Sequence, residues 1–160
     1  MTSTNLAGRR EPKHSVVVRH AVEGDRNSPG VNALLEAEPG YRAAFESGLN
    51  AHFASPHACV VMVAEREGSA VGFATARMAA RGKAKVCSSV VLPGHRRRGV
   101  GTEFVRSCLQ HAAGNWRACE VYVQLLQRER GRRAFESLGF KAISRERMPG
   151  CNMVFEVCRE

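Results

Sequence analysis

One stretch of the sequence combines residue types and spacing that suit phosphate binding. It spans residues 91–102 and reads VLPGHRRRGVGT. A strand-like run leads into a glycine-rich turn that opens a helix, so free main-chain N–H groups and the positive end of the helix dipole converge on one point. Glycines at 99 and 101 let a phosphate approach these amides, and three consecutive arginines offer charge-assisted hydrogen bonds. Because the stretch lacks the Gly-Lys-Ser/Thr of a Walker loop and the spacing of a dinucleotide-binding fingerprint, it predicts a phosphate site of another kind.

The six cysteines do not form a metal-ligand pattern. None of them is paired at C-x-x-C spacing, so the sequence predicts no metal site. Most of them fall inside apolar strand-like or helix-like runs of a chain that does not resemble a short secreted protein. We therefore expect buried thiols rather than disulfides.

Hydrophobic periodicity and turn residues predict the elements that position the loop. Helices are expected around residues 31–35, with Ser28 and Pro29 as N-cap and first helical residue, and over 41–53, 100–114 and 132–138. Strands are expected over 15–19, 59–65, 71–78, 83–92, 120–125, 140–145 and 153–158. This order indicates an α/β fold with a mostly antiparallel sheet interrupted by two crossover helices. Residues 1–14 are expected to be a flexible polar leader, and 15–160 a single domain.

Composition and charge narrow the class of protein. The 160 residues are 44% hydrophobic and 24% charged, as in an ordinary globular domain and unlike a disordered or fibrous chain. The net charge of +9 favours an anionic ligand such as nucleic acid, an acidic surface or a phosphate-bearing cofactor. The first twenty residues lack an apolar core, and the longest apolar run is 58–64, so we expect a cytoplasmic protein without a membrane partner.

The loop and its surroundings resemble a known family. The R-x-x-G-x-G core at Arg96, Gly99 and Gly101 follows V-x-P at 91–93 and precedes an amphipathic helix, and AFESLGF follows at 134–140. Together these features resemble the GNAT superfamily of acyl-CoA-dependent N-acyltransferases, from about residue 15 to the end. The resemblance implies a GNAT-type fold with a mixed, mostly antiparallel sheet of six to seven strands and about four helices. It also implies acetyl-CoA as co-substrate, with no metal.

The resemblance assigns the acetyl-CoA contacts to one strand end and the loop. In this family the strand before the loop splays from its neighbour, and its backbone pairs with the pantetheine arm of the cofactor. Those positions are Val90, Val91, Leu92 and Pro93. Main-chain amides of the loop and helix start would hold the pyrophosphate. That segment comprises Arg96, Arg97, Arg98, Gly99, Val100, Gly101, Thr102, Glu103 and Phe104.

The last crossover departs from the family pattern. Family members commonly carry an Asn before this helix and a Tyr within it, and the Tyr protonates the departing thiolate. Here Gln127 is the nearest amide, and Phe135, which has no proton to give, occupies the Tyr position. Tyr122 is a substitute acid or a packing residue. Of the carboxylates near the expected cleft, Glu120 and Glu65, the first is the candidate base, the alternative being a solvated strand end.

The sequence thus predicts an N-acetyltransferase that moves an acetyl group from acetyl-CoA to a primary amine of a small molecule or peptide. Direct attack in a ternary complex is expected, with the acceptor chosen by residues 25–57. Two alternatives stay open. One is a GNAT-like module that binds acyl-CoA without turnover; the other is an acyltransferase that acts on or binds tRNA through arginines at 96–98 and 128–133. A solvated helix face is the simpler explanation of the second arginine cluster. A homodimer paired through sheet edges is also left open.

Overall fold

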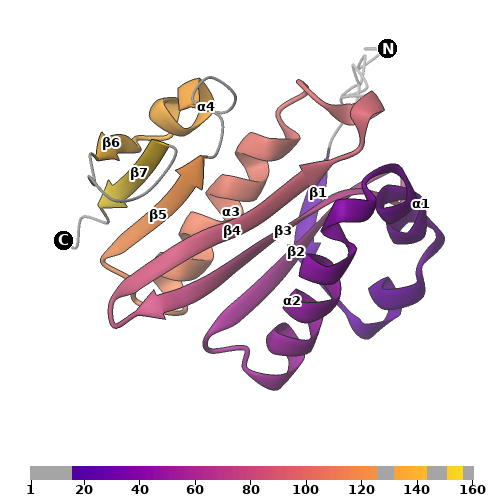
Figure 1. Cartoon of the computed structure of the whole chain (residues 1–160), viewed down its shortest axis with the longest axis horizontal. Coiled ribbons are helices and arrows are strands. Elements are labelled where there is room, and N and C mark those ends of the chain that lie inside the picture. Colours follow the sequence, from indigo (N-terminus) through magenta and orange to yellow (C-terminus); the bar gives the residue numbers. More distant parts are fainter. Residues whose placement is uncertain (1–15, 126–131, 144–150, 157–160) are drawn as a thin grey trace, which may run out of the picture.

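Seven strands form one mixed sheet with helices on both faces (Figure 1). The computed structural model describes residues 16–125, 132–143 and 151–156 of the chain. The strands are β1 (Val17–His20), β2 (Cys59–Arg66), β3 (Ser69–Ala80), β4 (Lys83–Val91), β5 (Glu120–Leu125), β6 (Lys141–Ile143) and β7 (Cys151–Glu156). Their order in the sheet is β1-β2-β3-β4-β5-β7-β6, and every neighbouring pair is antiparallel except β4 with β5. The predicted mixed, mostly antiparallel sheet is confirmed.

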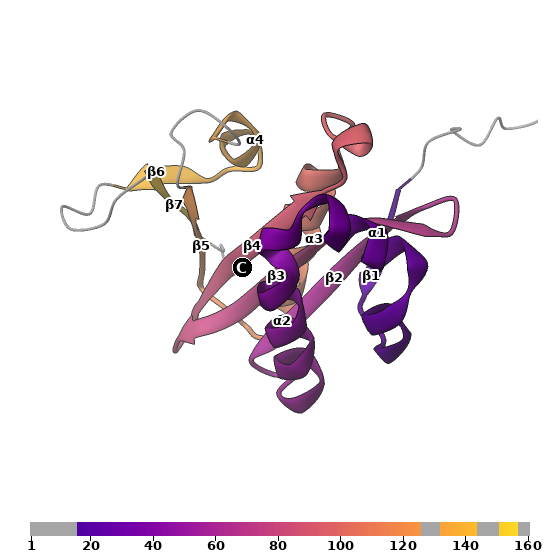
Figure 2. The ribbon, with the colours of Figure 1, turned by 45° about the vertical axis from the view of Figure 1, so that its right-hand side comes forward.

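The described residues form four α-helices beside this sheet. They are α1 (Pro29–Ala37), α2 (Arg42–Ala54), α3 (Val100–Gly114) and α4 (Arg132–Ser137), with 3₁₀ turns at Glu23–Asn27, Pro39–Tyr41 and Pro93–His95. The start of α1 is fixed as the sequence predicts, because the Ser28 hydroxyl accepts a hydrogen bond from the Val31 amide at 3.3 Å and Pro29 occupies the first turn. Figure 2 shows α1 and α2 in front of the sheet and α3 behind it.

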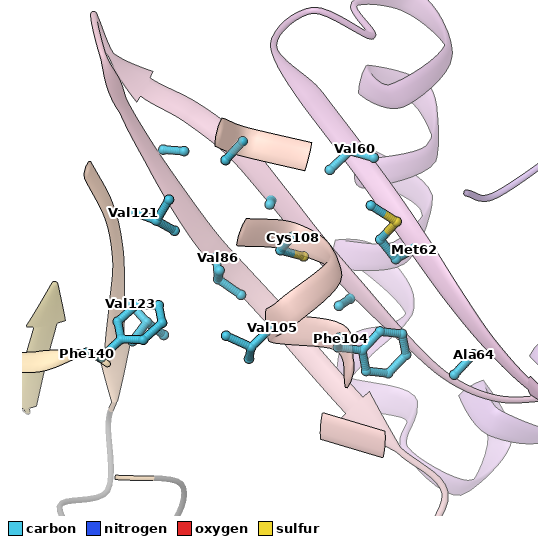
Figure 3. Packing of buried hydrophobic residues seen from close by; sticks show 14 of the residues in the cluster. Val60, Met62, Ala64, Val86, Phe104, Val105, Cys108, Val121, Val123 and Phe140 are labelled. Atoms are coloured by element: carbon cyan, nitrogen blue, oxygen red, sulfur yellow. The ribbon is translucent and has the colours of Figure 1, made fainter. Parts of the chain in front are cut away.

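Each face of the sheet has its own hydrophobic core. On the α3 face, Phe104, Val105 and Cys108 pack against alternate residues of β2 to β5, as Figure 3 shows. On the other face, α1 and α2 bury Leu34, Leu35, Phe45 and Leu49 against β2 and β3, together with Phe73 and Val90. Burying such a side chain fully stabilises the fold by about 1.5–3 kcal/mol. The four-residue steps of α3 therefore serve the core on one face, as the periodicity predicts.

The predicted elements all occur, and each predicted end that lies within the described residues agrees with the structure to within two positions. The first strand begins at Val17, and β3 extends beyond the predicted 71–78 to Ser69–Ala80. The last two strands lie at Lys141–Ile143 and Cys151–Glu156, and β7 is inserted between β5 and β6. The predicted leader, residues 1–14, lies outside the described residues.

The expectation of uniformly buried thiols is wrong for two cysteines. Cys87 and Cys119 are exposed, Cys59 is half-buried, and Cys108 is buried. Burial raises the pKa of the Cys108 thiol to about 12, which leaves it unreactive. Cys87 is exposed because it lies at an irregularity of β4 described below.

Within the described part of the chain, no helix is long and apolar enough to cross a membrane. The same residues contain no cluster of three or more His, Cys, Asp or Glu side chains that would hold a metal ion.

Candidate functional site

The central strand β4 has a free edge at its C-terminal end. Its parallel pairing with β5 runs from Lys83 opposite Glu120 to Val86 opposite Val123 and goes no further in the described residues. On its other edge β4 stays paired with β3 as far as Val91. Beyond the pair of Val86 and Val123, β4 and β5 diverge in both views (Figures 1 and 2). Main-chain groups of residues 87–91 that face β5 are thus available to an extended ligand, apart from the Val91 carbonyl, which accepts from Arg96 Nε.

A bulge in β4 marks the point where the strands part. Thr75 pairs with Ser88 but the next residue, Ala76, pairs with Val86, so Cys87 is the extra residue. Val86 accordingly packs in the α3 core, whereas Val90 packs in the α1–α2 core. A bulge exchanges the two faces of the strand and bends it.

The loop after β4 presents the start of α3 as an anion site. After the turn at Pro93–His95, Arg97 and Gly99 adopt positive φ angles of 60° and 82°, and Gly99 is the N-cap of α3. The Glu103 amide donates to the Gly99 carbonyl at 3.0 Å, which leaves the preceding amides of the first turn without helical partners. A Cβ atom added at Gly99 or Gly101 would meet no atom within 4 Å. The space before these amides is open, so they fit a pyrophosphate.

The three loop arginines differ in what they contact. Arg96 Nε donates to the Val91 carbonyl at 2.9 Å, and its Nη2 bonds the Glu38 carboxylate at the end of α1. Its side chain therefore ties the loop to β4 and α1. Arg97 and Arg98 are exposed and are the loop arginines whose side chains are free to reach a phosphate. Glu38 was not singled out by the sequence, since a contact across 58 positions leaves no local pattern.

Other predicted acetyl-CoA contacts split between backbone and side chain. The side chains of Val100 and Phe104 are fully buried in the α3 core (Figure 3), so these residues offer only main-chain groups. Thr102 and Glu103 are half-buried, and Glu103 forms an ion pair with Arg106. Among the positions before the loop, Val91 and Leu92 are half-buried and Pro93 is exposed.

The two candidate catalytic residues occupy the paired end of β5. Glu120 is the first residue of the strand, and its carboxylate lies 3.6 Å from Lys83 Nζ. The structure does not bring Glu120 to the free edge of β4, because it lies three pairs before the last one. Tyr122 is one pair from the divergence, opposite Lys85, whose Nζ lies 5.9 Å from the centre of its ring. Its neighbours Val121 and Val123 belong to the α3 core, so Tyr122 faces the opposite side of the sheet.

Glu65 is also absent from the free edge of β4. Its carboxylate bonds Arg19 of β1 at 2.8 Å, and Arg19 makes a two-pronged contact with Asp25 at 2.7 and 2.8 Å. Burial alone would raise the pKa of Asp25, but the hydrogen bonds from Arg19 and the Val22 amide hold it below its ordinary value. Glu65 is thus part of a structural ion pair at the edge of the sheet.

Of the two residues that depart from the family pattern at the last crossover, Phe135 lies within the described residues. The half-buried Phe135 ring packs edge-on against Phe140, with ring centres 5.1 Å apart, and contacts the α3 core. Gln127 lies outside the described residues, as do Arg128 and Arg130 of the second arginine cluster. A cofactor role for Phe135 and Gln127 stays a prediction.

Two histidines near helix ends are buried or half-buried. His52, at the end of α2, is buried, and its ring nitrogens bond the Ala21 carbonyl at 3.1 Å and the Val61 amide at 3.3 Å. His95, in the loop, is half-buried against Arg66. The pKa of His95 is lowered, first by burial and then by the charges of Arg66 and Arg98.

Comparison with known proteins adds a family to this geometry. The sequence model of the acetyltransferase (GNAT) family matches residues 30–140. A search of curated protein sequences gives no significant match.

Solved structures share the fold at low sequence identity. The ribosomal-protein-alanine N-acetyltransferase from Brucella melitensis superposes with a TM-score of 0.70 at 18% identity, covering 88% of this chain and 99% of its own. An IAA acetyltransferase from Bacillus cereus gives 0.67 at 15% identity, covering 89% and 100%. A GNAT family acetyltransferase from Elizabethkingia anophelis, solved with acetyl-CoA bound, gives 0.64 at 11% identity, covering 89% and 98%.

Proposed function

Because this chain belongs to the GNAT family of acetyltransferases, we propose that it transfers the acetyl group of acetyl-CoA to a primary amine by direct attack in a ternary complex. One observation carries the proposal. β4 loses its partner β5 after Val86 and runs with a free edge into the glycine-rich start of α3. An extended pantetheine arm would pair with that edge while the loop amides bind the pyrophosphate.

In this reaction the protein forms no covalent bond to the acetyl group. The amine nitrogen forms a bond to the thioester carbonyl carbon, and the carbon–sulfur bond breaks. The nitrogen, positively charged after the attack, loses one proton to become the amide. The thiolate of CoA takes up a proton. Main-chain N–H groups of β4 would polarise the carbonyl oxygen, and the cleft would hold the two reactants in contact.

The placement of the described carboxylates favours an acceptor that loses its proton easily. Glu120 lies away from the free edge of β4, and the carboxylates near the loop, Glu38 and Glu103, form ion pairs with Arg96 and Arg106. An α-amine with a pKa near 8 loses its proton at pH 7 about 250-fold more readily than a lysine amine near 10.4. We therefore propose an α-amine, of an amino acid or a peptide N-terminus, ahead of a lysine side chain.

Acetyl-CoA binding provides the first test. At a hundredfold its dissociation constant, acetyl-CoA should stabilise the fold by about 2.7 kcal/mol, visible as a rise in Tm. Replacing both Arg97 and Arg98 of the loop, in R97Q/R98Q, should weaken acetyl-CoA binding about tenfold or more. The control R81Q removes an exposed turn arginine and should leave binding unchanged. No stabilisation by acetyl-CoA or CoA would overturn the proposal.

Turnover separates an enzyme from a binding module. Release of free CoA thiol should be followed with alanine-terminated peptides, free amino acids, polyamines and aminoglycosides as acceptors. Thiol release that depends on the acceptor supports the transferase. Stabilisation by acetyl-CoA without thiol release from any amine would favour the binding module, a reading prompted by Phe135 at the family's Tyr position.

A further inference from the structure

A cavity lies beside the start of α1. It has a volume of about 470 Å³, and its walls come from three places in the chain: the first turns of α1, the β2–β3 hairpin, and the residues just before the loop. Figure 2 shows the hairpin extending past α1. The lining residues are Pro29, Gly30, Ala33, Arg66, Glu67, Ser69, Ala70, Val71, Leu92 and His95. The cavity shares Leu92 with the predicted acetyl-CoA contacts, whereas none of residues 96–104 lines it.

A buried guanidinium forms part of the wall. Arg66 is only 7% exposed, and none of the described carboxylates lies within ion-pair distance of it. Its Nη1 lies 2.8 Å from Nδ1 of His95, while its Nε is buried with no hydrogen-bond partner among the described residues. A guanidinium has only donors, so His95 must accept with an unprotonated Nδ1. A buried positive charge without a counter-charge is costly, and an anion would offset that cost.

The start of α1 adds a second positive feature to the same cavity. Pro29, Gly30 and Ala33 of its first turns line the cavity, and the helix is nine residues long. Gly30 packs so closely on β3 that a Cβ atom there would lie 2.8 Å from the Ala70 amide nitrogen. The positive end of the helix dipole is thereby held against the hairpin that carries Arg66. Glu67 also lines the cavity, but it is exposed at the hairpin turn, where water screens its charge.

The remaining walls are apolar and small. Ala33, Ala70, Val71 and Leu92 supply aliphatic surface, and the volume matches cavities that hold small organic ligands rather than single ions. We propose that this cavity binds a small organic anion, with its carboxylate or phosphate at Arg66 and its apolar body against Ala33, Ala70 and Leu92. This site is additional to the proposed acetyl-CoA site. Leu92 and His95 belong both to the cavity wall and to the segment that enters the phosphate loop, so an occupant would contact that loop.

Binding of phenyl phosphate to the full chain tests the proposal directly. Titration followed by ¹H–¹⁵N NMR should shift the amides of residues 30–33, 66–71 and 92–95, also with saturating CoA present. Benzyl alcohol, which lacks the charge, should bind at least tenfold more weakly, and inorganic phosphate, which lacks the apolar body, should also bind more weakly. R66M should weaken phenyl phosphate binding at least tenfold, and the exposed-arginine control R81M should not.

A cavity-filling variant provides a second test that does not depend on whether R66M folds. Ala33 is exposed on α1, so A33W should fold normally, fill the cavity and abolish phenyl phosphate binding. Acetyl-CoA stabilisation of A33W should persist, which separates the two sites. The proposal is overturned if phenyl phosphate does not shift these amides, if CoA displaces it, or if folded R66M and A33W bind it as tightly as the original chain.

Discussion

Gly72 of β3 lies so close to Val90 of β4 that a Cβ atom on Gly72 would stand 2.6 Å from the Val90 carbonyl oxygen. The same Cβ atom would lie 3.1 Å from the ring of Phe104 in α3. The strand with the free edge, its inner neighbour and the first turns of α3 thus meet at this glycine. Its missing side chain allows β4 to hold the position from which the loop begins.

Gly72→Ala should therefore disturb both stability and the proposed acetyl-CoA site. A methyl group cannot fit against a main-chain oxygen without moving β4, and overpacking of this kind costs about 1–3 kcal/mol of unfolding free energy. Urea unfolding and acetyl-CoA titration measure the two effects. Gly40→Ala is the control, because a Cβ atom at Gly40 meets nothing within 4 Å. Unchanged stability of G72A would show that β4 adjusts freely.

Gly99→Ala should lower both the stability of the fold and the affinity for acetyl-CoA. Gly99 has φ 82°, and placing an L-residue in this region costs about 1–2 kcal/mol. Relief of this strain would shift the amides at the start of α3, so we expect acetyl-CoA affinity to fall at least tenfold. Calorimetric titration measures the affinity.

Gly114→Ala, at the other end of α3, is the matched control. It lies in the last helical turn with open space around it, so alanine should be neutral or stabilise by up to about 1 kcal/mol. An unchanged acetyl-CoA affinity in G99A, beside a normal G114A, would remove the loop amides from the proposed site.

Sequence patterns predicted what depends on neighbours along the chain. The four-residue steps of Phe104, Cys108 and Ala112 give α3 its buried face, and Ser28 with Pro29 marks the start of α1, because these signals are local. Contacts between distant residues left no such signal. Arg96 meets Glu38 across 58 positions, and Arg66 meets His95 across 29.

Strand register explains the different outcomes for the candidate catalytic residues. Alternation identified β5 but did not say which of its residues lie opposite the free edge of β4. The parallel pairing assigns Glu120 to the closed end and leaves Tyr122 one pair from the divergence. The bulge at Cys87 lies where β4 and β5 part. Neither a glycine nor a proline stands at this point of the sequence, so no local signal predicts it.

Arg19→Met should destabilise the fold through Asp25. Asp25 is 3% exposed, and Arg19 binds both of its carboxylate oxygens. Without Arg19 this carboxylate would be buried with no counter-charge, and since Arg19 is itself partly solvated we expect a loss of about 2 kcal/mol. Arg26→Met breaks the exposed pair with Glu23 and should cost less than about 0.5 kcal/mol. Equal effects in urea unfolding would contradict this account.

Acidification should weaken the fold through histidines at the junction of β1 and α3. The rings of His20 and His111 are 5.0 Å apart, and His52 lies 6.1 Å from His20. The pKa of His20 is lowered by burial and by His52, and that of His111 by burial and by both other histidines, from the ordinary value of 6.5. The unfolded chain then binds more protons, so stability is full above pH 6.5 and falls as the pH drops below it.

Unfolding free energies at pH 7.5, 6.5 and 5.5 measure this loss. The double variant H20Q/H111Q should show a smaller decrease between pH 6.5 and 5.5 than the original chain. His57→Gln, at an exposed turn, should retain the original decrease. A double variant that loses stability as steeply as the original chain would assign the acid sensitivity to other groups.

Tyr122→Phe should lower the turnover number of the proposed transferase. Tyr122 faces the side of the sheet opposite α3, one pair before β4 and β5 part, and Phe135 at the family's usual position has no proton to donate. If Tyr122 protonates the departing thiolate, Y122F should reduce kcat about a hundredfold with little change in KM for acetyl-CoA.

Tyr41→Phe is the control, because Tyr41 is the chain's other tyrosine and packs edge-on to Phe73. Unchanged kcat in Y122F would limit Tyr122 to packing beside Lys85, and equal losses in Y122F and Y41F would indicate a shared structural effect. A loss of kcat confined to Y122F, together with disappearance of the fall in kcat that a titrating acid causes above the pH optimum, would identify Tyr122 as the acid.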